Sequence, residues 1–96
     1  MTLKAGALID RYGGEGGNFF SPYGESFGKR SLPSYQNSRK YMCYEVLKDE
    51  EVLQGQVLPW FNREGRGVQY ETSKTVKQLK EAGVLKPRPD KKRRED

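Results

Sequence analysis

The 96-residue chain contains no histidine and only one cysteine, and these two shortages exclude several classes of protein. A single cysteine cannot form an internal disulfide, so the chain is not a disulfide-stabilised scaffold. Without histidine there is no Ser-His or Cys-His catalytic pair and no histidine-ligated zinc site. One cysteine is also too few for a cysteine-ligated cluster, and we therefore expect no metal.

Long apolar stretches are also missing. No uninterrupted apolar run approaches the roughly 20 residues that a membrane-spanning helix needs, so we expect no membrane insertion. Residues 1–10 lack a basic region followed by an apolar stretch, and we expect no signal peptide there. If the chain is exported, we expect the targeting signal to lie on a longer parent protein.

The net charge of +5 is concentrated towards the C-terminus. Residues 86–96 carry six basic and three acidic side chains, so this stretch holds +3 and residues 1–85 hold only +2. A nearly neutral folded part argues against a specific nucleic-acid partner. The basic run Lys91–Arg94 keeps one alternative open, a non-enzymatic module that binds nucleic acid through its tail.

What the chain does contain is typical of a small β-rich domain. Hydrophobic residues make up 33%, including 6 Tyr, 4 Phe and 1 Trp, which is enough for a thin core. The patterns predict strands over residues 4–12, 41–48 and 68–71, two short strands around Gly55 within residues 51–58, and one helix over residues 73–82. Thr72 or Ser73 is the expected N-cap, and Gly83 the residue that ends the helix.

These elements predict an α+β fold, mainly an antiparallel β domain with a C-terminal helix. Val84 and Leu85 are expected to fold back onto the core, and residues 87–96 to form a basic solvated tail after a domain of residues 1–86. Cys43, within an aromatic strand, is expected to pack rather than to react. Residues 59–61 (Pro-Trp-Phe) fit either the core or an aromatic wall for a flat ring.

Several polar positions are candidates for binding or catalysis. The four glycines of residues 13–17 match neither a P-loop nor a dinucleotide fingerprint, and alone they predict a flexible hairpin-like connection. Arg11 and Arg30 lie beside small residues, and the guanidinium group of an arginine can bind a diphosphate through two hydrogen bonds. The sequence pattern is equally compatible with two ordinary surface arginines. Because side chains alternate along a strand, Gln69 and Glu71 lie on the same face, where they either line a cleft or face solvent.

Seven segments, taken in order, match one known family. They are Ile9–Gly13, Gly17–Gly24, Lys29–Pro33, Tyr41 with Tyr44–Val46, Pro59–Phe61, Gly65–Tyr70, and the closing helix with Gly83–Leu85. Together they cover about residues 6–86 and resemble the tuberculosis necrotizing toxin (TNT) domain family. Members of that family, with fungal surface relatives, hydrolyse NAD(P)⁺ to nicotinamide and ADP-ribose. The resemblance also implies a fold distantly like that of ADP-ribosyltransferases.

The resemblance implies a substrate-binding set. The functional arginines of the family fall on Arg11 and Arg30, which are expected to hold the diphosphate. The aromatic residue beside the nucleotide falls on Phe19 or Phe20, and Tyr12 belongs to the same substrate-binding group. NAD(P)⁺ is then the substrate, and no separate cofactor is expected.

The resemblance also implies a catalytic set. The catalytic glutamine of the family falls on Gln69, expected to hydrogen-bond the nicotinamide ribose or to place the water. Arg11 is expected to act with it as a catalytic residue, and Glu71 to stabilise the sugar cation. Two positions depart from the family pattern. Met42 stands near a position where the best-studied members have histidine, and Arg66 stands where a small residue is common. Arg66 is expected either to add a phosphate contact or to point outward.

The expected function is therefore that of an NAD(P)⁺ glycohydrolase toxin domain. The alternatives are an ADP-ribosyltransferase that uses the Gln-x-Glu pattern of Gln69 and Glu71, or the basic nucleic-acid-binding module. The resemblance further implies a larger secreted carrier protein, delivery as an effector into the cytoplasm of a target cell, and a cognate immunity protein. The site arginines favour an acidic face on that partner.

Overall fold

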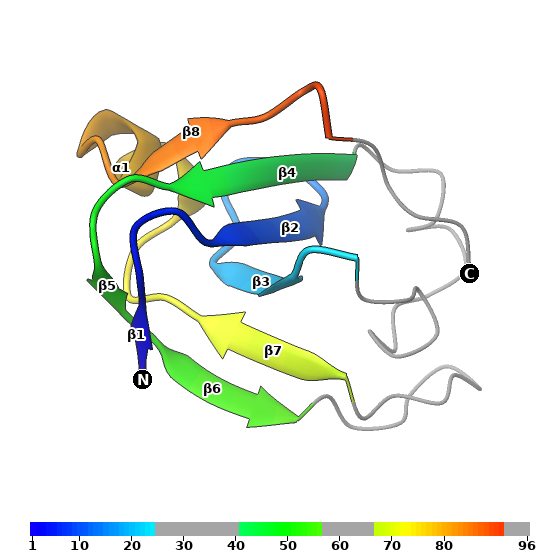
Figure 1. The fold of residues 1–96 in the computed structure, drawn as a ribbon, viewed down its shortest axis with the longest axis vertical. Helices are drawn as coiled ribbons and strands as arrows, with labels where there is room; N and C mark the ends of the chain where they lie inside the picture. The colour runs from blue at the N-terminus through cyan, green and yellow to red at the C-terminus, as the bar shows by residue number, and fades with distance from the viewer. Residues whose placement is uncertain (25–40, 57–66, 92–96) are drawn as a thin grey trace.

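The computed structural model describes residues 1–24, 41–56 and 67–91, which form two antiparallel sheets and one short helix (Figure 1). The strands are β1 (Thr2–Leu3), β2 (Leu8–Tyr12), β3 (Phe19–Pro22), β4 (Tyr41–Val46), β5 (Glu50–Glu51), β6 (Leu53–Gln56), β7 (Val68–Glu71) and β8 (Leu85–Pro87). Helix α1 (Val76–Glu81) lies between β7 and β8 in the chain. The predicted small antiparallel domain with a C-terminal helix is confirmed.

The main sheet joins segments that are far apart in the sequence. Its strand order is β6-β7-β3-β2-β4-β8, and each neighbouring pair is antiparallel. Strand β3 lies at its centre because its two halves have different partners: Phe19 and Phe20 pair with β7, and Ser21 and Pro22 pair with β2. The sheet therefore places β7, from the second half of the chain, one strand away from β2.

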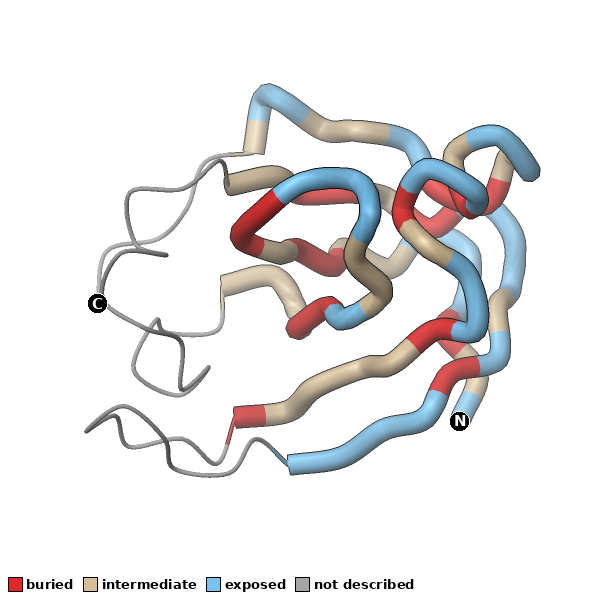
Figure 2. Tube along the Cα trace, turned by 180° about the vertical axis from the view of Figure 1, so that it is seen from behind, coloured by how far each residue is buried: buried red, intermediate tan, exposed pale blue. Residues whose placement is uncertain are grey.

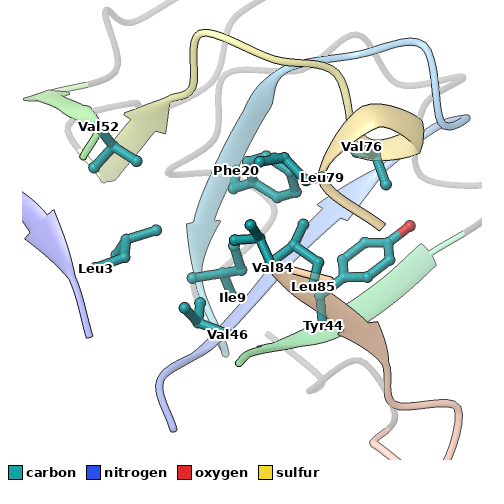
Figure 3. Close-up of a cluster of buried hydrophobic side chains, with 10 residues drawn as sticks. All are labelled: Leu3, Ile9, Phe20, Tyr44, Val46, Val52, Val76, Leu79, Val84 and Leu85. Atoms are coloured by element: carbon teal, nitrogen blue, oxygen red, sulfur yellow. The ribbon is translucent and has the colours of Figure 1, made fainter. Parts of the chain in front are cut away.

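Helix α1 packs against one face of this sheet, and β8 continues the sheet beside β4 (Figures 1 and 3). The buried cluster consists of Leu3, Ile9, Phe20, Tyr44, Val46, Val52, Val76, Leu79, Val84 and Leu85. Within it the rings of Phe20 and Tyr44 meet edge to face, with centroids 6.1 Å apart. Val84 and Leu85 do fold back onto the core, as their sequence position predicts.

The helix is shorter than the pattern predicts and begins three residues later. Its N-cap is Thr75, whose hydroxyl accepts from the Gln78 N–H while the Gln78 side chain accepts from the Thr75 N–H. The predicted cap at Thr72 or Ser73 is wrong, because the hydroxyl and the N–H of Thr72 bond elsewhere, to the carbonyls of Lys74 and Asn18. Gly83, with φ of 74°, ends the helix as expected.

The chain between residues 50 and 56 also differs from expectation. Gly55 does not separate two strands but lies inside β6, opposite Gln69. The break falls at Val52, which is buried, because β5 pairs with β1 before the chain continues into the main sheet. Strand β6 is exposed along its whole length and forms an edge of the main sheet (Figure 2).

The C-terminal region is attached to the sheet beyond residue 86. Pro87 belongs to β8 and pairs with Tyr44 of β4. Arg88 forms ion pairs with Glu45 and Asp90, and its N–H donates to the Cys43 carbonyl. Pro87 and Arg88 therefore extend the folded part beyond the predicted start of the solvated tail, through strand pairing with a residue distant in sequence.

Candidate functional site

The main sheet separates Arg11 from the two predicted residues of β7. Ile9 and Tyr70 both pack with the hydrophobic core, so they mark the core side of their strands. Side chains alternate along a strand, and Arg11 therefore leaves β2 on the same side as Ile9. By the same rule Gln69 and Glu71 leave β7 on the opposite side. We call it the open side because it is partly exposed along β6 and β7, although Asp10, Tyr12 and Cys43 on the same side of β2 and β4 are buried. The structure brings Gln69 and Glu71 together and places Arg11 across the sheet from them.

The open side carries a row of partly apolar residues around Glu71. Glu71 is the register partner of Phe19 on β3 and of Leu53 on β6. Phe19 is 44% exposed and Leu53 is 70% exposed, so both present apolar surface to solvent. A groove of about 390 Å³ runs past this row and is lined by Met1, Glu51, Val52, Leu53, Glu71, Thr72 and Ser73. Of its two carboxylates, Glu51 forms an ion pair with the N-terminal ammonium group, so the groove presents Glu71 beside apolar walls.

The three predicted aromatic residues differ in what a ligand could touch. Phe20 is 2% exposed and packs inside the core against Tyr44. Tyr12 is buried too, and its ring meets that of Tyr41 edge to face, with centroids 5.2 Å apart. Phe19 alone of the three offers substantial free surface. Of Phe19 and Phe20, Phe19 is therefore the one that a ligand can reach, because the pairing of β3 with β7 turns Phe20 into the core.

Arg11 lies against the glycine-rich stretch of residues 13–17. Its Nη1 donates to the Phe19 carbonyl at 2.9 Å. A Cβ at Gly17 would lie within 2.5 Å of the Arg11 Cζ, and one at Gly13 would lie 2.9 Å from Nη2. The guanidinium thus fills space that the absent side chains of Gly13 and Gly17 leave open. Burial lowers the pKa of Arg11, and the nearby Tyr44 opposes that shift.

The same stretch connects the antiparallel strands β2 and β3, as the predicted hairpin-like connection requires, and it is also bound to helix α1. The Gly17 carbonyl accepts from Val76 N–H at 2.9 Å, and the Glu15 carbonyl accepts from Lys77 N–H at 3.0 Å. The Glu15 carboxylate also forms an ion pair with Lys80. These contacts satisfy two of the free N–H groups at the start of α1. They also hold the glycines around Arg11.

The sequence analysis missed Asp10, which is fully buried in the middle of β2. Its Oδ2 accepts from the Tyr41 hydroxyl at 2.6 Å and from the Gly24 N–H at 3.2 Å. Asp10 is the register partner of Ser21 on β3 and of Cys43 on β4. The signal was present in the sequence, since an aspartate within a strand of otherwise buried pattern requires hydrogen-bond partners.

Cys43 is a packed thiol. It is buried beside Asp10 in the sheet, and burial with the nearby Asp10 charge raises its pKa from 9.0 to about 11. A thiol with this pKa is almost entirely protonated at neutral pH and is a poor nucleophile. Across residues 1–24, 41–56 and 67–91, no group of three or more His, Cys, Asp or Glu side chains is placed to hold a metal ion. In the same parts of the chain no helix is long and apolar enough to cross a membrane.

The family can now be assigned from comparison with known proteins. The family model described as tuberculosis necrotizing toxin matches residues 2–87, which is most of the chain. The chain belongs to this toxin family. The match ends at Pro87, the last residue of β8, and so agrees with the extent of the paired strands.

One curated relative supports the assignment, and one solved structure shares the fold. The conidial surface nicotinamide adenine dinucleotide glycohydrolase nadA of Aspergillus fumigatus is 35% identical over 92 residues, which is 88% of this chain and 39% of that protein. The solved structure of tuberculosis necrotizing toxin complexed with its immunity factor matches with a TM-score of 0.72 at 20% identity, over 90% of this chain and 54% of that one. The chain therefore spans well under two thirds of either relative.

The remaining predicted site residues lie outside the described part of the chain. Arg30 falls within residues 25–40, Arg66 within residues 57–66, and the Pro-Trp-Phe run of residues 59–61 in the same range. Met42, which stands near the position where the resemblance implies a histidine, is partly buried on the core side of β4. No imidazole takes its place, because the chain contains no histidine.

Proposed function

We propose that this TNT domain is an NAD(P)⁺ glycohydrolase that cleaves the bond between nicotinamide and ribose. The observation that carries the proposal is the match to the family over residues 2–87, together with 35% identity to a protein named as an NAD glycohydrolase. The chain spans only 39% of that relative, so the activity of the relative is a proposal for this chain.

The residues of the open side suit this reaction. Nicotinamide leaves as a neutral group, so the step needs no general acid, and the sugar passes through a cation like that of glycoside hydrolysis. Gln69 is proposed to hydrogen-bond the nicotinamide ribose or to place the attacking water. Glu71, beside it on the same face, would stabilise the cation, and Phe19 would support a flat ring.

The diphosphate is proposed to be held by Arg11 and Arg30. Arg11 is already positioned by the Phe19 carbonyl and by the glycines of residues 13–17, so its guanidinium needs little ordering when substrate binds. It lies across the sheet from Gln69, so a long dinucleotide would have to extend past the ends of the strands to contact both. Arg66 is kept as a candidate phosphate contact.

The test is an NAD⁺ consumption assay on the purified chain, with products separated by chromatography. We expect free nicotinamide and ADP-ribose from the wild type and loss of turnover in Gln69→Ala. Gln54→Ala is a matched control. Gln54 is an exposed glutamine on the neighbouring strand β6, and because it pairs with Tyr70 its side chain lies on the opposite face of the sheet from Gln69. A Gln69→Ala protein with full activity contradicts the assigned role, and a folded wild type without turnover contradicts the function.

A second candidate is an ADP-ribosyltransferase, favoured by the placement of Gln69 and Glu71 on one face of β7. The two reactions share the cleavage step and differ in what accepts the ribosyl group. Assay with NAD⁺ labelled in the adenosine part distinguishes them, because label on protein indicates transfer and label in free ADP-ribose indicates hydrolysis.

The proposed context is that of a delivered toxin. The solved family member is complexed with its immunity factor, and the Aspergillus relative is named as a conidial surface protein. We therefore propose an effector carried by a larger secreted protein, acting in the target-cell cytoplasm. A cognate immunity protein with an acidic face would protect the producer. Co-expression rescue of a poisoned host by such a protein tests this part of the proposal.

A further inference from the structure

We propose that Asn18 and Thr72 are positioning residues, whose mutual hydrogen bonds hold Phe19 beside Glu71 on the open side of the sheet. The Thr72 N–H donates to the Asn18 carbonyl at 2.9 Å, and the Asn18 side-chain amide donates to the Thr72 carbonyl at 2.8 Å. The two residues are not among the catalytic or substrate-binding residues proposed above. The inference rests on the proposed function, because the pair affects turnover only if Phe19 and Glu71 contact the substrate.

The pair continues the ladder between β3 and β7 by one position. Phe19 is the register partner of Glu71, so the next opposing residues are Asn18 and Thr72, each just outside its strand. There a side-chain amide supplies one of the two hydrogen bonds that a bonded antiparallel pair otherwise exchanges between main-chain groups. Because bonded and non-bonded pairs alternate, Phe19 and Glu71 form a non-bonded pair, the kind in which facing side chains lie closer together.

The hydroxyl of Thr72 fixes the chain where it leaves β7. Thr72 is 3% exposed, and its hydroxyl donates to the Lys74 carbonyl at 2.6 Å. A buried hydroxyl is costly unless it is hydrogen-bonded, and a valine would fill the same space without that requirement. Thr72 also lines the groove together with Glu71. The bond to Lys74 therefore holds the main chain directly after Glu71, at the wall of the groove.

Asn18 connects the two proposed halves of the substrate site. It follows Gly17, whose missing side chain leaves room for the Arg11 guanidinium. Its partner Thr72 follows Glu71 and lines the groove. The hydrogen-bonded pair thus joins the chain around Arg11 to the chain beside Glu71, and it acts on substrate through these neighbours.

The experiment is a double-mutant cycle on the full chain, measured as NAD⁺ turnover. We expect Asn18→Ala to lower kcat/KM about tenfold, less than the roughly hundredfold loss that a displacement of about 1 Å can cause. In a Phe19→Ala background the same substitution should change kcat/KM by less than about twofold, because a residue that acts through Phe19 then has no ring to position. A merely structural role would give the same fold-change in both backgrounds.

Thr72 supplies a second pair of variants. Thr72→Val removes the hydroxyl with little change in volume and should lower kcat/KM, whereas Thr72→Ser keeps the hydroxyl and should retain most of the activity. Thr75→Ala is the matched control, because the Thr75 hydroxyl bonds the Gln78 N–H within α1 and Thr75 does not line the groove. Well below its Tm, Thr75→Ala should leave kcat/KM within about twofold of the wild type and combine additively with Phe19→Ala.

Amide exchange provides a readout that does not depend on activity. In Asn18→Ala the Thr72 amide should exchange about tenfold faster, as the loss of one hydrogen bond predicts, while exchange at the core amide of Val46 is unchanged. With an active wild type, unchanged Thr72 exchange, no effect of Asn18→Ala on turnover, or equal effects in both backgrounds overturns the positioning role alone. If Asn18→Ala does not fold, the contrast between Thr72→Val and Thr72→Ser decides in its place. A folded wild type without turnover contradicts the proposed function, and the role of the pair with it.

Discussion

The guanidinium of Arg11 occupies the space that any side chain at Gly17 would need. A Cβ there would lie within 2.5 Å of the Arg11 Cζ, while the Arg11 Nη1 is held by the Phe19 carbonyl. The glycine at position 17 therefore leaves room for the Arg11 side chain of β2. It is not required by φ, since Gly17 is absent from the glycines with positive φ in the described chain.

We predict that Gly17→Ala displaces Arg11 and lowers kcat/KM for NAD⁺ by about ten- to hundredfold, the range expected when a positioned group moves by about 1 Å. The fold should persist, because the clashing atoms are the end of a side chain. Gly16→Ala is the matched control, since its Cβ would meet nothing within 4 Å. Equal activity of the two variants would show that the position of Arg11 is irrelevant to turnover.

Substitution of Phe19 should weaken substrate binding, whereas substitution of Phe20 should lower the stability of the fold. Phe20→Ala removes a ring from the core and is expected to cost about 3–5 kcal/mol, lowering Tm by more than about 10 °C. Phe19→Ala should leave Tm nearly unchanged, because Phe19 is 44% exposed, and should raise KM for NAD⁺ several-fold through the loss of about 1 kcal/mol of ring contact. Thermal unfolding and steady-state kinetics on both variants measure the contrast. A normal Tm for Phe20→Ala would be inconsistent with its place in the core.

Thr75 is predicted to be the residue that caps α1. Thr75→Ala removes the acceptor for the Gln78 N–H and should destabilise the domain by about 1 kcal/mol, or roughly 4–8 °C in Tm. Ser73→Ala, two residues earlier and exposed, should have little effect. Thermal denaturation followed by circular dichroism compares the two. A larger loss in Ser73→Ala would favour the start of the helix that the sequence pattern suggested.

The buried thiol predicts a fall in stability at alkaline pH. The pKa of Cys43 rises from 9.0 to about 11 in the folded state, so between these values the unfolded chain loses its thiol proton first. The folded state then binds more protons, and the free energy of unfolding decreases as pH rises through this interval. Urea titrations between pH 8 and pH 11 should show a shallower decrease in Cys43→Ala. Rapid modification of the native thiol at pH 8 would contradict the raised pKa.

Local patterns predicted the fold class and several elements. The aromatic run that became β4, the left-handed Gly83 and the return of Val84 and Leu85 to the core depend on neighbours within a few residues, which the sequence displays directly. The motifs that resemble the toxin family also lie along the chain in order, so the sequence alone sufficed to suggest the family. The cap at Thr75 was missed because Thr72 found partners on Asn18 and Lys74 instead.

Only the tertiary structure decided how the candidate residues are grouped. The order β7-β3-β2-β4 puts Glu71 beside Phe19, turns Phe20 inward and leaves Arg11 on the core side. The convergence of Gly24 and Tyr41 on Asp10 spans 14 and 31 residues of sequence, respectively. The physical reason is that strand pairing is non-local: alternation fixes which residues of one strand share a face, but only the register between distant strands decides which residues meet.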